Sequence, residues 1–144
     1  MNVEVGLALL ADYANVTADG KLNILGVFDT IFAERFPTIH PQIHLILQLE
    51  AHPAEAGAQK QVEIRLMTED GRTAFSISAD IAFQRKDSSP LGEMMKTQQI
   101  IGFQNIRFEK PGTYQFAILV NAETKKTVGL KVQQRTPPQA MPGK

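Results

Sequence analysis

The sequence predicts an all-β fold, namely an antiparallel β-sandwich of seven to nine strands, with a closed β-barrel as the alternative. Apolar side chains alternate with polar or small ones along most of the chain, as an antiparallel sheet with one solvated face requires. Asp19-Gly20, Asp70-Gly71 and Pro111-Gly112 lie between alternating segments, and glycine supplies the positive φ of hairpin turns. No segment shows a convincing helical period.

The expected strands follow from this alternation. Residues 22–32 are apolar on both faces and therefore predict a central strand, covered on both sides. Glycines within strand patterns, such as Gly6 and Gly26, indicate a bulge or a close backbone contact. The alternating segments are residues 3–13, 43–50, 62–66, 75–83, 114–120 and 128–132. The expected core is Val5, Leu7, Leu9, Leu22, Ile24, Phe28, Leu45, Leu47, Ile64, Leu66, Phe75, Ile77, Ile81, Phe116, Ile118, Val120 and Leu130.

Length and composition predict one soluble domain. The 144 residues are 43% hydrophobic and 21% charged, which is typical of a globular chain. Residues 1–135 are expected to form the domain, and residues 136–144, with three prolines, a flexible tail. The first residues have no basic region, and no segment approaches the ~18 apolar residues of a membrane helix. We therefore expect a cytoplasmic location and no membrane insertion.

Composition also argues against several classes of partner and cofactor. Fifteen basic and fifteen acidic residues cancel, so no global field favours nucleic acid. The absence of tryptophan and the presence of two tyrosines leave few aromatic rings for stacking on bases or sugars. The absence of cysteine excludes disulfides, thiolate metal sites and cysteine nucleophiles.

Motifs of catalysis are missing from the sequence. It has no G-x-S-x-G, no S-x-x-K and no glycine-rich phosphate loop. His44 and His52 share one strand face but lie roughly 26 Å apart along it, too far to share a metal. Asp12, Asp19 and Asp29 are too dispersed for a calcium loop. We therefore expect that the protein is not an enzyme and that it uses no cofactor or metal. The histidines are expected to be solvated surface residues, and the alternative is a single histidine that acts as a general base.

Two groups of residues are candidate binding sites. Met94 and Met95, with Leu91 nearby, either contact a partner or plug one end of the sandwich. Lys125 and Lys126 belong to a largely basic C-terminal segment, which either faces an anion or discourages pairing between sheet edges.

Two motifs resemble known families. Residues 8–14 (ALLADYA), residues 20–29 (GKLNILGVFD) and Phe36-Pro37 resemble small bacterial all-β proteins of unknown function. Residues 108–116 (FEKPGTYQF), with Leu130-Lys131-Val132, look like the last hairpin of immunoglobulin-like sandwiches, which implies that topology. Neither resemblance implies a catalytic residue, a cofactor or a substrate.

The leading functional hypothesis is a non-enzymatic protein-interaction or structural module in a homo- or hetero-assembly. It rests on a chain rich in strands, without catalytic motifs, that can bind a partner by strand addition at a sheet edge. The alternative is a binder of a small molecule or glycan at the sandwich end near residues 87–96.

Overall fold

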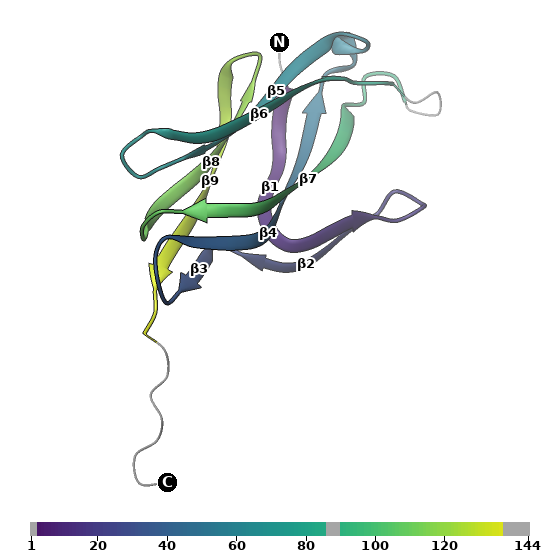
Figure 1. The fold of residues 1–144 in the computed structure, drawn as a ribbon. Helices are drawn as coiled ribbons and strands as arrows, with labels where there is room; N and C mark the ends of the chain where they lie inside the picture. Colours follow the sequence, from purple (N-terminus) through teal and green to yellow (C-terminus); the bar gives the residue numbers. More distant parts are fainter. Residues whose placement is uncertain (1–2, 86–89, 137–144) are drawn as a thin grey trace, which may run out of the picture.

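The computed structural model describes residues 3–85 and 90–136, and within them the chain forms nine strands and one short 3-10 turn (Figure 1). The strands are β1 (Val3–Val16), β2 (Leu22–Phe28), β3 (Thr30–Ala33), β4 (Thr38–Ala51), β5 (Gln59–Met67), β6 (Thr73–Ala82), β7 (Met95–Phe108), β8 (Gly112–Val120) and β9 (Glu123–Gln134). The turn, η1 (Pro53–Glu55), connects β4 to β5.

The described strands form two sheets that pack face to face. One sheet has the order β2-β1-β4-β7, and the other has the order β3-β9-β8-β5-β6. Neighbouring strands pair antiparallel, apart from the parallel pair of β3 and β9. Because no described strand belongs to both sheets, the predicted sandwich is confirmed and the closed barrel is not found.

The main core lies between the two sheets and is built by the predicted alternation. Phe103 joins the sheets, since its ring centroid lies 5.4 Å from that of Phe75 and 5.4 Å from that of Phe116. Val5, Phe28, Phe75 and Ile81 are partly buried against this core. The predicted positions that are buried are Leu45, Leu47, Ile64, Leu66, Phe116, Ile118, Val120 and Leu130.

The core prediction is wrong for one set of β1 and β2 residues. The pairing of β1 with β4 shifts by one residue between Val5 and Leu7, so the faces exchange beyond the bulge. Leu10 therefore packs between the sheets in place of Leu9. Leu7 and Leu9 instead pack in a second cluster formed within the four-stranded sheet. The predicted core residues Leu22 and Ile24 of β2 also belong to this cluster, together with Ala11, Ala14, Ile46 and Ile100.

The predicted central strand over residues 22–32 is also wrong. The chain divides at Asp29 into β2 and β3, which are edge strands of different sheets. Both faces carry apolar residues because Phe28 and Ile31 pack into the core from opposite sheets. Leu25 and Val27 are exposed on β2.

Tyr114 supports the corner between β7 and β8. Its hydroxyl donates a hydrogen bond to the carbonyl oxygen of Lys110 over 2.7 Å, and its ring meets Phe108 edge-on. Burial raises the pKa of this hydroxyl.

We expect Tyr114→Phe to lower the free energy of unfolding by about 1 kcal/mol, because it leaves a carbonyl at the corner without its donor. Urea denaturation of wild type and variant measures this difference. The control is Tyr13→Phe at the other tyrosine, which is 45% exposed and should change stability little. Equal effects of the two substitutions on the free energy of unfolding would show that the hydrogen bond from Tyr114 to Lys110 makes no specific contribution to stability.

Candidate interaction site between two sheet edges

An apolar groove separates the edge strand β6 of one sheet from the edge strand β7 of the other. Its inner part is a cavity of about 100 Å³. The groove continues past Ile77 as an open trough between residues 74–77 of β6 and residues 103–107 of β7. We call the whole feature the β6–β7 groove. The cavity is lined by Leu47, Val62, Ile64, Ile77, Ser78, Ala79, Ile81, Gln99 and Ile101.

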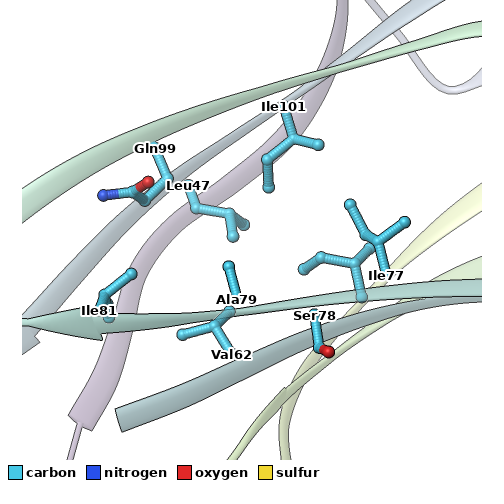
Figure 2. A pocket seen from close by; sticks show the side chains of 9 residues that line it. Leu47, Val62, Ile77, Ser78, Ala79, Ile81, Gln99 and Ile101 are labelled. Carbon is cyan, nitrogen blue, oxygen red and sulfur yellow. The ribbon is translucent and has the colours of Figure 1, made fainter. Parts of the chain in front are cut away.

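Both sheets contribute aliphatic side chains to the cavity. Figure 2 shows Ile77, Ala79 and Ile81 on the inward side of β6, facing Gln99 and Ile101. Ile77 is 42% exposed, although its side chain lies on the core face of its sheet. This corrects its predicted place in the core, and the cause is that β6 is an edge strand with the groove at its side.

The two strands bordering the groove carry few charges. Asp80 is the charged residue of β6, while Lys96 and Arg107 lie near the two ends of β7. Edge strands usually avoid unwanted pairing through charges, prolines, bulges or short length. Over residues 75–79, β6 has none of these protections and pairs regularly with β5. Toward its start the pairing is interrupted by a bulge at Ala74, since Leu66 lies opposite Phe75 and Met67 lies opposite Thr73.

The other two sheet edges are shorter or interrupted. β3 has four residues, and the Arg135 guanidinium lies 4.9 Å from the centre of its Phe32 ring. β2 has no charged residue, but Gly26 has φ +70° at its middle. A side chain at Gly26 would also meet the Asp12 carboxylate, since an added Cβ would lie 2.5 Å from Asp12 Oδ2. β6, with ten residues, is longer than either of these edges.

The predicted binding residues do not form one site. Leu91 is 90% exposed and Met94 is 38% exposed, in the segment that leads into β7. Met95 is 5% exposed and packs in the main core as the first residue of β7. Lys125 and Lys126 lie on β9 in the other sheet, and Lys125 Nζ is 3.3 Å from Glu123 Oε1. Residues 87–89 of the predicted ligand-binding end are outside the described residues.

The histidines have structural contacts. His52 caps η1, because its Nδ1 accepts a hydrogen bond from the Ala54 backbone N–H over 3.0 Å. His44 Nδ1 lies 3.2 Å from the Asp12 carbonyl oxygen, and burial lowers the pKa of His40. Over residues 3–85 and 90–136, no group of three or more His, Asp or Glu is placed to hold a metal ion.

One ion pair near the groove's end is largely buried. Lys60 Nζ pairs with a Glu55 carboxylate oxygen, and this hydrogen bond lowers the pKa of Glu55. The pair ties η1 to the start of β5, so it supports the fold beside the cavity.

The fold and the groove define a two-sheet β-sandwich with open edge strands. Residues 6–133 match DUF6941, a family of unknown function, and the chain belongs to this family. That membership confirms the resemblance to an all-β family of unknown function. No curated protein matches this sequence. In the part of the chain described here, no helix has the length and hydropathy needed to cross a membrane.

One of the solved chains that match this chain shares a distant likeness with it. It is the alkylpurine DNA glycosylase AlkC of Pseudomonas fluorescens, bound to DNA containing an abasic site analog. The sequences are 16% identical, the TM-score is 0.42, and the match covers 91% of this chain and 30% of the glycosylase chain. A likeness of this size carries no argument about function.

Proposed function

We propose that this chain is a non-enzymatic interaction module that joins a protein assembly by accepting a strand at the edge of the β6–β7 groove. The observation that carries the proposal is a long edge, nearly free of charge, beside an open apolar groove. In strand addition, backbone hydrogen bonds along the edge supply affinity, and alternate side chains enter the apolar surface beneath it.

The strand order gives further support. Immunoglobulin-like sandwiches place strands A, B, E and D in one sheet and C, F and G in the other. β1, β4 and β7 correspond to A, B and E, while β5, β8 and β9 correspond to C, F and G. Among the described residues, no strand occupies the place of D beside β7. We infer an immunoglobulin-like domain in which the strand after C, β6, pairs with C, so that both strands bordering the groove are edge strands.

The alternative from the sequence, a small-molecule or glycan ligand near residues 87–96, stays a prediction. The cavity lies along the groove, is lined mostly by aliphatic side chains and therefore suits an apolar group better than a sugar. Its modest size favours side chains of an added strand. We expect the assembly to form in the cytoplasm.

The test compares capture from native lysate by wild type and by Ile77→Lys, with light scattering on the eluate. A lysine directed toward the groove should block strand addition, and at a position 42% exposed its ammonium can still reach water. We expect a stoichiometric partner or a defined oligomer with wild type and its loss with Ile77→Lys.

The matched control is Leu25→Lys, on the β2 edge of the other sheet, where the side chain is 64% exposed. This variant should keep the association. A wild-type protein that is monomeric and unpartnered in its own extract, or an Ile77→Lys variant that associates normally, would contradict the proposal.

A further inference from the structure

Building on the proposed function, we propose that the strand accepted beside β6 is anchored by one branched aliphatic side chain, which enters the cavity at Ala79. The side chains two residues before and after this anchor are small and uncharged. The inference comes from the sizes of the inward side chains of β6 and from the absence of charge along the groove.

The cavity lies at a small residue between two large ones. Ala79 follows Ile77 and precedes Ile81 on the inward face of β6, and the pairing with β5 is regular from Ile77 to Ile81. A methyl group between two isoleucines leaves a space that Ile101 of β7 does not fill from the other sheet, and Figure 2 shows Ala79 pointing into this space. Because Ala79 is exposed, the cavity can be entered from solvent.

A strand added beside β6 brings its alternate side chains to these positions. Laterally adjacent residues of paired strands share a face, so the partner residue beside Ala79 directs its side chain into the cavity. The partner residues two positions away lie beside Ile77 and Ile81, whose branched side chains already occupy the inward face there. A large side chain therefore fits beside the alanine, and small ones fit beside the isoleucines.

The size and chemistry of the cavity suit one aliphatic group. Its volume is about 100 Å³, and an apolar cavity of about 150 Å³ can hold a benzene molecule. The matching group is therefore a side chain of three or four carbons, as in valine, leucine or isoleucine. Gln99 also borders the cavity, but its Nε2 already donates a hydrogen bond to Thr97 Oγ1 over 3.1 Å.

The charges around the groove argue against a charged side chain at the inward positions. Residues 73–79 of β6 and residues 97–106 of β7 contain no charged side chain. Lys60, which lies opposite Ile81, is paired with Glu55. A carboxylate or ammonium group of the partner would lose its hydration in the cavity without gaining an ion pair.

The experiment titrates the isotopically labelled full chain with synthetic peptides of the sequence Thr-Thr-Ser-Thr-X-Thr-Ser-Thr-Thr, where X is leucine, alanine or lysine. Backbone amide chemical shifts measured by NMR give the Kd of each peptide. Burial of one methylene strengthens binding by roughly fourfold, so leucine should bind about tenfold or more tightly than alanine. The lysine peptide should bind no better than the alanine peptide, and the shifts should concentrate on β6 and β7.

Ala79→Leu fills the cavity from the chain itself and should abolish the preference for the leucine peptide. Ala79→Val fills less of the cavity and should reduce this preference in part. The matched control is Ser78→Leu, which places the same side chain on the outer face of the same strand, since Figure 2 shows the Ser78 hydroxyl pointing away from the cavity. This control should keep the preference. Circular dichroism checks that all variants fold.

The outcomes separate this inference from the proposed function. Equal Kd values for the leucine and alanine peptides, no binding of the leucine peptide, or a preference that survives Ala79→Leu would overturn the anchor. In each of these cases, a lysate partner lost with Ile77→Lys would still support the proposed function. If Ile77→Lys captures its partner normally while the leucine preference depends on Ala79, the proposed function fails and the anchor cavity stands as a peptide site.

Discussion

Replacement of Phe116 by alanine is expected to lower the free energy of unfolding by about 3–5 kcal/mol. Phe116 is 0% exposed, lies on β8 between Leu66 of β5 and Val128 of β9, and meets Phe103 of the opposite sheet. Its removal takes away the transfer energy of a whole ring and leaves a cavity between sheets that cannot fully collapse. Domains are stable by only about 5–15 kcal/mol, so this is a large share.

Equilibrium urea denaturation followed by circular dichroism measures the effect. Phe32→Ala is the control, because its side chain is 49% exposed on the short edge strand β3 and should cost much less. If Phe116→Ala lowered the free energy of unfolding no more than Phe32→Ala, the central position of the Phe116 ring between the sheets would be contradicted.

Strand interiors are the part of this fold that the sequence predicts best. Leu45 and Leu47, or Ile64 and Leu66, alternate with a period of two, and they are buried because each strand is paired without a register shift over that length. The period fails at the β1 bulge, where one extra residue exchanges the two faces. Gly6, at this bulge, was the local signal for it.

Strand partners and edges are harder to predict. Residues 22–32 have the composition of a central strand, yet their apolar faces serve two different sheets. β7 was not predicted as a whole, because it is rich in glutamine and Asn105 takes φ 55° within it. Period and composition report burial on each face, but they do not report which strand lies alongside.

The candidate site depends on which strands lie at the sheet edges, and the sequence patterns do not report this. The inward residues of β6 look like an ordinary core pattern, and Ile77 was accordingly predicted to be buried. Consecutive strands usually pair, so β6 and β7 would be expected to lie side by side rather than to border a groove. The local signal available was the absence of charge over residues 73–79.

Ile46→Ala is expected to lower the free energy of unfolding by about 2–4 kcal/mol, which would establish the second cluster as a true core. Ile46 is 0% exposed, although its neighbours Leu45 and Leu47 are the ones that face the other sheet. Leu9 and Ile100 lie directly opposite it on the adjacent strands.

The control is Ile39→Ala in the same strand, where the side chain is 56% exposed and the loss should stay below about 1 kcal/mol. If Ile46→Ala also lowered the free energy of unfolding only slightly, the outer face of the four-stranded sheet would behave like a solvated surface and be open to a partner. The expected large loss means that the face is already filled by its own side chains. The proposed association then uses a sheet edge, as strand addition at β6 does.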